Sequence, residues 1–340
     1  MICSGLAAGT VIVGGLTRLT KSGLSMVDWH LFKELPPMNH EAWQREFEKY
    51  KQFPEFKLAN HNMSLEEFKK IWWMEYIHRS LGRTIGGVFA VPAAFFWYKG
   101  WLVKAMKKRT CVLAALLLGQ GLLGWYMVKS GLEEETAKKY SDPRVSHYRL
   151  AAHLGTAFLF YSMLFYTGLS HSLTPQLVAL TPQVMTLRKL AHSSKGLIFL
   201  TALSGAFVAG IDAGRIYNTY PLMGDKLIPG DILAEKPLWK NFLENPTTTQ
   251  FDHRLLGHLV LASVVMTWVY SRRVQLSPRQ RMACNTLIAA AFFQVGLGIS
   301  TLLFEVPTVL ASSHQTGALG LLSAALWLTH DLKVVKYVPK

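Results

Sequence analysis

Charged residues and cysteines are scarce in this sequence. Only 17% of the 340 residues are Asp, Glu, Lys or Arg, whereas 50% are hydrophobic, which excludes an ordinary soluble domain and a disordered chain. Cys3, Cys111 and Cys284 lie in apolar stretches without ligand-like spacing, which argues against a disulfide framework or a thiolate metal centre. No targeting segment precedes the first apolar stretch, so we expect that a presequence has been removed or that the sequence is truncated.

The apolar residues form eight blocks that approach or reach the roughly 20 residues a helix needs to cross a bilayer. We therefore predict an all-α polytopic membrane protein with eight transmembrane helices. The blocks are residues 2–16, 77–98, 111–128, 150–169, 196–211, 255–270, 285–304 and 309–328.

The connector 17–73 is the longest and carries many charges. Its segments 41–50 and 65–73 predict short helices on the membrane surface. We expect the connector to be a solvated loop, with a lid over the site as the alternative. Trp72 and Trp73 are predicted to anchor the chain at the membrane interface.

The formal net charge of +15 does not indicate nucleic-acid binding, because the basic residues are segregated. The connectors 99–110, 170–195 and 271–282 and the tail 329–340 contain fifteen Lys and Arg but one acidic residue, Asp331. With eight crossings these four lie on one side, which predicts a cytoplasmic or matrix face. The acidic residues gather in the opposite connectors, at Glu34, Glu66, Glu67, 133–135, Asp225 and Asp231.

The chain also contains an internal repeat. The segment EYIHRSLGR at 75–83 aligns with QFDHRLLGH at 250–258. In the same register, QGLLG at 120–124 aligns with QVGLG at 294–298, and HLG at 153–155 aligns with HQTG at 314–317. A weaker match pairs VGG at 13–15 with VAG at 208–210. Because each half has an even number of blocks, both enter the membrane from the same side. We predict two tandem pseudo-symmetric four-helix bundles, residues 1–170 and 196–340, joined by an inner linker 171–195.

Four histidines occupy equivalent positions of this repeat, each near the acidic-side end of a predicted helix: His78, His153, His253 and His314. Two facing helices that each offer an imidazole can supply both axial ligands of a haem. The predicted pairs are therefore His78 with His153 and His253 with His314. A non-haem metal stays open, although three of the four helices lack carboxylate or thiolate partners.

The residues around the first histidine of each pair suggest further roles. Arg79 and Arg254 follow their histidines and could clamp haem propionates, because a guanidinium suits carboxylates. For Arg83 we favour snorkelling to lipid headgroups, and for His258 a structural role. Glu75 lies three residues before His78, where the second half has the neutral Gln250. We favour a proton-transfer role for Glu75 over capping of the helix dipole.

The sequence resembles the haem A synthase family of mitochondria and related bacteria over essentially its whole length. GGLTRLTKSGLSM at 14–26 is similar to the first-loop signature of that family, and Glu75-x-x-His78-Arg79 to its second-helix motif; residues 218–223 and Gln250-x-x-His253-Arg254 add matches. Some bacterial members carry a cysteine pair in the first outer loop that this chain lacks, so a thiol-dependent step is not implied here. The long insertion at 33–70 is similar to the mitochondrial subgroup.

The resemblance implies oxidation of the C8 methyl of haem O to the formyl group of haem A, by two hydroxylations and loss of water, for cytochrome c oxidase. It implies that His78 and His153 hold the haem O substrate, that His253 and His314 hold a haem b cofactor, and that Glu75 is the acidic active-site residue. Ferredoxin and ferredoxin reductase would supply electrons from the matrix side, with haem O synthase and oxidase assembly factors as further partners. The expected location is the mitochondrial inner membrane, with the histidines toward the intermembrane space.

Two other functions stay open at this point. One is a bis-His transmembrane cytochrome b that passes electrons between two permanent haems; the asymmetry between Glu75 and Gln250 argues against it, since a pure relay needs no carboxylate in one half only. The other is a transporter, which the repeat alone permits. A transporter predicts broken helices around a site at the membrane midplane, whereas these histidines lie near one surface.

Overall fold

The chain is helical throughout the part that the structure, a computed structural model, describes: residues 1–30, 34–133, 143–174, 176 and 181–333. Within those residues the only strand-like feature is an isolated bridge between Met223 and Lys226. Three predicted features lie partly outside the described residues: the acidic side (Glu134 and Glu135), the linker (177–180) and the end of the basic tail (334–340).

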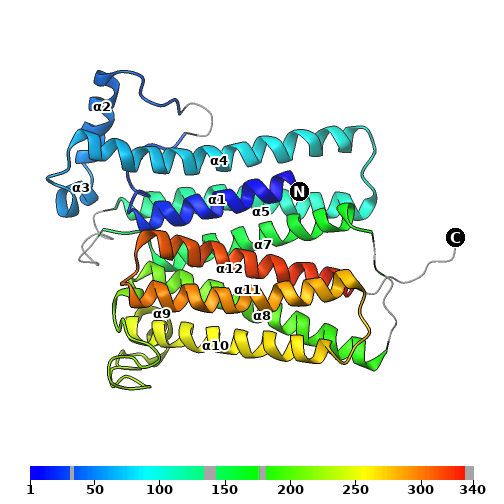
Figure 1. Ribbon diagram of the computed structural model, residues 1–340. Helices are drawn as coiled ribbons and strands as arrows, with labels where there is room; N and C mark the ends of the chain where they lie inside the picture. Colours follow the sequence, from blue (N-terminus) through cyan, green and yellow to red (C-terminus); the bar gives the residue numbers. More distant parts are fainter. Residues whose placement is uncertain (31–33, 134–142, 175, 177–180, 334–340) are drawn as a thin grey trace. The chain divides into compact units, whose positions relative to one another are not determined.

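Two compact units make up the chain, Ile2–Phe160 and Tyr161–Lys340, the latter including Met1. The first holds α1 (Ile2–Leu19), α2 (His40–Lys51), α3 (Pro54–Ala59), α4 (Leu65–Tyr98), α5 (Lys104–Gly131) and the start of α7 (His147–Ser172). The second holds the rest of α7, then α8 (Pro182–Gly210), η1 (Ala213–Arg215), η2 (Leu238–Lys240), α9 (Asn241–Glu244), α10 (Pro246–Ser271), α11 (Pro278–Leu303) and α12 (Thr308–Asp331) (Figure 1).

Six of these helices, α1, α5, α7, α8, α10 and α11, are long and apolar enough to cross a membrane. This finding supports the predicted all-helical, multi-pass membrane protein. The other two predicted blocks fall in α4 and α12, which do not meet the same measure of length and apolarity. The count of eight crossings therefore stays a prediction.

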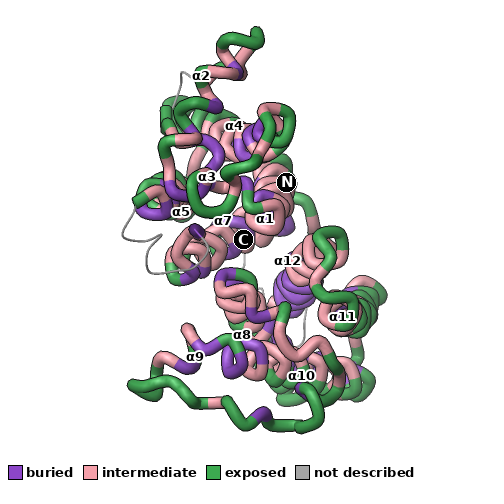
Figure 2. Tube along the Cα trace, turned by 90° about the vertical axis from the view of Figure 1, so that its left-hand side faces the viewer, coloured by how far each residue is buried: buried purple, intermediate pink, exposed green. Residues whose placement is uncertain are grey.

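Burial differs among the long helices of the second unit. On α12 the segment from Leu319 to Asp331 contains many buried residues, whereas α11 alternates buried residues with exposed ones along its length (Figure 2). Exposed apolar side chains on α11, such as Phe292 and Phe293, suit contact with lipid. Polar contacts tie the helices together: Ser194 of α8 lies 2.6 Å from the Ser263 hydroxyl of α10, and Gln280 of α11 donates to the Asp331 carbonyl of α12. Such hydrogen bonds stabilise membrane helix pairs, between which lipid provides no hydrophobic drive.

Helix α4 is longer than the sequence pattern predicted. Ser64 and Glu67 form a capping box, in which each side chain hydrogen-bonds to the other residue's backbone N–H, so the helix begins at Leu65. The predicted surface helix at 65–73 is therefore wrong as a separate element, because it forms the first turns of α4. The other predicted helix, 41–50, is confirmed within α2.

The first outer connector has its own hydrophobic core, so the expectation of a plain solvated loop is wrong. Trp43, Phe47 and Tyr50 of α2 pack against Phe68 and Trp72 of α4, with Met26 beside them. Tyr50 and Phe68 are fully buried and stacked, with ring centroids 5.1 Å apart. Trp72 is only 2% exposed, so it belongs to this core and is not an interfacial anchor.

Candidate functional site

The first predicted pair of histidines lies inside the first unit. The ring of His78 on α4 fits against Gly14 of α1, where an added Cβ would lie 2.6 Å from the ring Cε1. The ring of His153 on α7 fits against Gly124 of α5 in the same way, at 3.4 Å. Both histidines are half-buried, with the Nδ1 atom of each ring fully buried. At Gly14 a Cβ would be too close for the ring to stay in place, whereas at Gly124 a Cβ would make an ordinary contact with the ring.

The second predicted pair has the same construction in the second unit. A Cβ added to Gly205 of α8 would lie 3.1 Å from Cε1 of His253 on α10, and one added to Gly298 of α11 would lie 2.8 Å from Cε1 of His314 on α12. The centroids of the two imidazole rings lie 6.2 Å apart, and the ring planes are nearly perpendicular, at 87°. Two helices thus present one imidazole each across the interior of the unit.

Glutamines fix the second histidine of each pair. Gln120 of α5 donates from Nε2 to the backbone carbonyl of His153 at 3.0 Å. Gln294 of α11 makes the same bond to the carbonyl of His314 at 2.9 Å. In each unit the glutamine lies four residues before the glycine that contacts the ring. One face of α5 therefore contacts both the backbone and the side chain of His153, and one face of α11 does the same for His314.

The donor set fits an axially ligated haem better than a bare metal ion. Nitrogen ligands bind metals at about 2 Å, so two imidazoles on opposite sides of one metal have centroids roughly 6 Å apart, close to the distance between His253 and His314. Within the described residues, no group of three or more His, Cys, Asp or Glu side chains is placed to hold a metal ion. A haem supplies its own four equatorial nitrogens and needs only two axial ligands.

His78 is not near the start of its helix, unlike the other three histidines. His153, His253 and His314 lie in the first two turns of α7, α10 and α12, as predicted. Because α4 begins at Leu65, His78 lies more than three turns inside it. The same observation removes the capping interpretation of Glu75, which is well inside the helix and distant from its N-terminus.

Glu75 is a buried carboxylate, 4% exposed, that pairs with Arg79 one turn further along α4, with 2.6 Å between Oε1 and Nε. Arg79 also donates from Nη1 to the backbone carbonyl of Asp28 and from Nη2 to that of Met26, and Nη1 lies 3.6 Å from the carboxylate of Glu34. The ion pair therefore lies where the first outer connector passes over α4. A buried carboxylate held close to a predicted ligand can accept or release a proton.

Gln250 and Arg254 occupy the matching positions on α10. Arg254 donates to the side-chain oxygen of Gln250 at 2.9 Å and to the carbonyls of Tyr217, Thr219 and Leu222 in the second outer connector. Gln250 donates in turn to the carbonyls of Ala213 and Ile216. Both arginines thus hold connector backbone, a role that the sequence did not suggest; propionate binding stays a prediction for Arg79 and Arg254.

Arg83 and His258 complete the set of residues that the sequence singled out. Arg83 pairs with the carboxylate of Glu34 and donates to the carbonyl of His30, so the expectation that it snorkels to lipid headgroups is wrong. His258 lies 3.0 Å from the hydroxyl of Tyr220 and 2.7 Å from the carbonyl of Arg254. These contacts fit the structural role expected for His258.

The first-loop motif shapes the start of the connector. After α1 the chain turns through Lys21 in the left-handed region, φ 52°. The buried hydroxyl of Ser25 then donates to the carbonyl of Ile71 on α4 at 3.1 Å. In the second half, Asn218 donates to the carbonyls of Gly214 and Leu302, which joins the connector to α11. The first motif therefore places its connector next to α4, which bears His78, and the second joins its connector to α11, whose Gly298 contacts the ring of His314.

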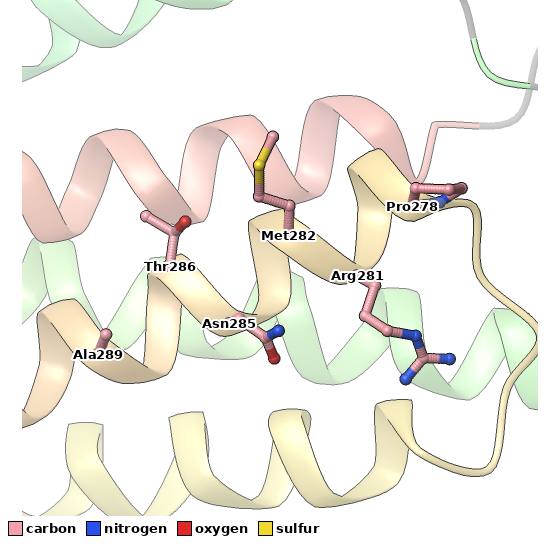
Figure 3. Close-up of a pocket in the computed structure, with 6 residues that line it drawn as sticks. All are labelled: Pro278, Arg281, Met282, Asn285, Thr286 and Ala289. Atoms are coloured by element: carbon pink, nitrogen blue, oxygen red, sulfur yellow. The ribbon is translucent and has the colours of Figure 1, made fainter.

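A surface hollow lies apart from the histidine pairs. It follows α11 near its N-terminus, with Met282 and Thr286 on one side of the helix and Arg281 and Asn285 on the other (Figure 3). Ala289, at one end of the hollow, is nine residues from Gly298, roughly 13 Å along a helix. The hollow is therefore separate from the histidine pair.

Comparisons with known proteins place the chain in a family. Residues 1–326 match the family model COX15-CtaA, described as cytochrome oxidase assembly protein. The chain belongs to this family. Among curated relatives, the haem A synthase COX15 of Homo sapiens is 55% identical over 336 residues, which cover 98% of this chain and 82% of the relative. The haem A synthase of Nitrosospira multiformis is 44% identical over 333 residues, 98% of this chain and 92% of the relative.

More distant eukaryotic members of the family extend the likeness. The haem A synthase COX15 of Saccharomyces cerevisiae is 42% identical over 358 aligned positions, which cover 97% of this chain and 74% of the relative. The family resemblance read from the motifs is thereby confirmed.

The sequence did not indicate that Gly14, Gly124, Gly205 and Gly298 contact the histidines. The signal that could have found the first and third is the shared pattern Thr-x-x-x-Gly at 10–14 and 201–205.

Proposed function

We propose that this protein is a haem A synthase, a membrane oxidoreductase that converts the C8 methyl group of haem O into the formyl group of haem A for cytochrome c oxidase. The observation that carries the proposal is the repeated arrangement of two half-buried histidines on neighbouring helices, each packed against a glycine. Membership of a family whose relatives bear this name supports it. The repeat is read as two pseudo-symmetric four-helix bundles within eight transmembrane helices.

Each pair of histidines has its own role in this proposal. His78 and His153 hold the haem O substrate, and His253 and His314 hold a haem b cofactor. When bound, haem b supplies one-electron chemistry at its iron. Glu75 lies one turn before His78 and moves a proton at its carboxylate during oxidation of the substrate. Arg79 and Arg254 keep the connectors in place over the two sites and contact the propionates as these groups bind.

The environment follows from charge and family. The protein lies in the mitochondrial inner membrane with its histidine-bearing ends toward the intermembrane space and its C-terminus in the matrix, because the basic connectors favour the matrix side. A ferredoxin with its reductase supplies electrons from that side. Haem O synthase and oxidase assembly factors are further partners.

Extraction of the haems from the purified protein with acidified solvent tests this function. Haem b together with haem O or haem A supports a synthase. Two equivalents of haem b per chain, with no haem O or haem A, would instead support the cytochrome b relay. Replacing His153 with Ala should remove haem O and haem A and leave haem b, while His314→Ala should remove haem b. Loss of the opposite haem would reverse the assignment of the two sites.

A further inference from the structure

The two units surround the Nδ1 atoms of their histidines differently. On α1 and α8 the matching segments read Thr10-Val-Ile-Val-Gly14 and Thr201-Ala-Leu-Ser-Gly205. Both glycines contact a histidine ring, and the carbonyls of Thr10 and Thr201 lie beside His78 and His253. These contacts make Gly205 the counterpart of Gly14. This register differs by one helical turn from the sequence match of 13–15 with 208–210. In this register Val13 corresponds to Ser204.

Ser204 makes a hydrogen-bonded chain that Val13 cannot make. Its hydroxyl donates to the carbonyl of Thr201 at 2.8 Å and lies 2.7 Å from Nδ1 of His253. Since the hydroxyl proton goes to the carbonyl, the oxygen is free to accept from Nδ1–H of the imidazole. That tautomer leaves the lone pair on Nε2 for a metal. Nδ1 of His78, in contrast, is buried and lacks a hydrogen bond of normal geometry in the described structure.

The second histidines of the two pairs also differ, but in another way. Nδ1 of His314 lies 3.0 Å from the side-chain nitrogen of Gln294, which can only donate, so this contact does not hold a proton on Nδ1. Nδ1 of His153 is buried and has no hydrogen-bond partner among the described residues. The cause is a residue three positions after each histidine. Thr156 accepts from Gln120 and holds that amide away from the ring, whereas Gly317 leaves the space that Gln294 occupies.

We propose that Ser204 makes the second-half site the one that retains its haem, and that Val13, which offers no acceptor, keeps the first-half site exchangeable. This inference rests on the proposed function, which needs one haem to stay and another to enter and leave. A hydrogen-bond acceptor at the second nitrogen of a ligating imidazole fixes its tautomer and raises its basicity, and loss of such a partner commonly costs about 10–100-fold in metal affinity. Ser204 is thus a positioning residue that acts through His253.

The test compares Ser204→Val with Ser204→Thr in the full-length protein. Valine and threonine have nearly the same shape and differ in the hydroxyl group, so a packing effect would appear in both. Haem loss is followed by transfer to excess apomyoglobin in the His78→Ala background, in which only the second-half site is complete. We expect about 10–100-fold faster loss for the valine variant, near-normal loss for the threonine variant, and an upward shift of the haem reduction potential for valine alone.

Val13→Ser provides the reciprocal test in the His253→Ala background. A gained hydroxyl beside His78 should slow haem loss from the first-half site. Equal loss rates and potentials for the wild type and Ser204→Val, or equal defects in the valine and threonine variants, would overturn the proposal. These readouts need no haem A production. A protein that binds haem in both units, makes no haem A and still responds to Ser204→Val would refute the proposed synthase function but leave the role of Ser204 toward His253 intact.

Discussion

The two outer connectors support the same kind of histidine pair by different means. The first folds around aromatic side chains, with Tyr50 and Phe68 fully buried. The second is held by polar groups: Asn245 donates to the carbonyl of Asp231, and Thr247 and Tyr217 donate to the carboxylate of Asp231. Each is also held by an arginine that follows a histidine. The comparison teaches that a repeat can preserve its ligands and their glycine contacts while the surrounding structure diverges.

The largest difference in chemistry lies at Glu75 and Gln250. Replacement of Glu75 by Gln should lower haem A formation about 100-fold or more, the usual range for loss of a proton-transfer group, while the bound haems remain. Haem A content in cells and the absorption spectrum of the purified protein measure the two effects separately. Unchanged haem A formation would remove Glu75 from the mechanism.

The reciprocal variant Gln250→Glu sharpens this comparison. A carboxylate cannot donate to the carbonyls of Ala213 and Ile216, so two buried acceptors lose their partner, at a cost of about 1–3 kcal/mol each. We expect faster proteolysis of the second connector with haem A formation much less affected than in Glu75→Gln. An intact connector in this variant would show that the amide donors are dispensable.

Glycine contacts should matter almost as much as the ligands themselves. Gly298→Ala places a Cβ 2.8 Å from the ring of His314, whereas Gly296→Ala, on the same helix, meets nothing within 4 Å. In the first unit, Gly14→Ala and Gly9→Ala form the same contrast. The contact variants should lose much of the haem from their own unit. The control variants should retain it and gain up to about 1 kcal/mol of helix stability. Equal haem content in both members of a pair would contradict the close packing.

Core truncation should affect the first connector more than the second. Phe68→Ala removes a fully buried ring from the aromatic core and should cost about 3–5 kcal/mol locally. Asn241→Ala, in the second connector, breaks hydrogen bonds to the carbonyls of Glu235 and Leu238 and should cost about 1–3 kcal/mol. Hydrogen exchange of each connector measures both effects, and equal protection losses would contradict the contrast.

Acid should weaken the second connector by a small amount. Hydrogen bonds from Thr247 and Tyr217 hold the pKa of Asp231 below its ordinary value. A carboxyl group with a lowered folded-state pKa stabilises the fold above its unfolded pKa, and this contribution is lost as pH falls through the folded pKa. Proteolysis of the connector should therefore accelerate below about pH 4, and Asp231→Asn should remove most of that acid dependence. The same acid response in both proteins would assign it to another group.

Much of the candidate site was predictable from the sequence because its signals are periodic. Apolar blocks of membrane length predict helices, and the repeated His-Arg pairs predict that His78 and His253 occupy equivalent positions. The connectors were less predictable. The aromatic residues of 43–72 are separated by charged residues, so their shared core appears only when α2 and α4 pack together.

The amino-acid sequence by itself determined the family, the helical membrane class and the identity of the paired histidines, because each depends on composition or on local spacing. Only the tertiary structure decided which glycine faces which ring, that Arg83 pairs with Glu34, and that Ser204 reaches His253 while Val13 leaves Nδ1 of His78 without a partner of this kind. These contacts join residues far apart in the chain, and the rotation of one helix against another sets them. A one-turn change of register alters such contacts without altering the apolar pattern of either helix.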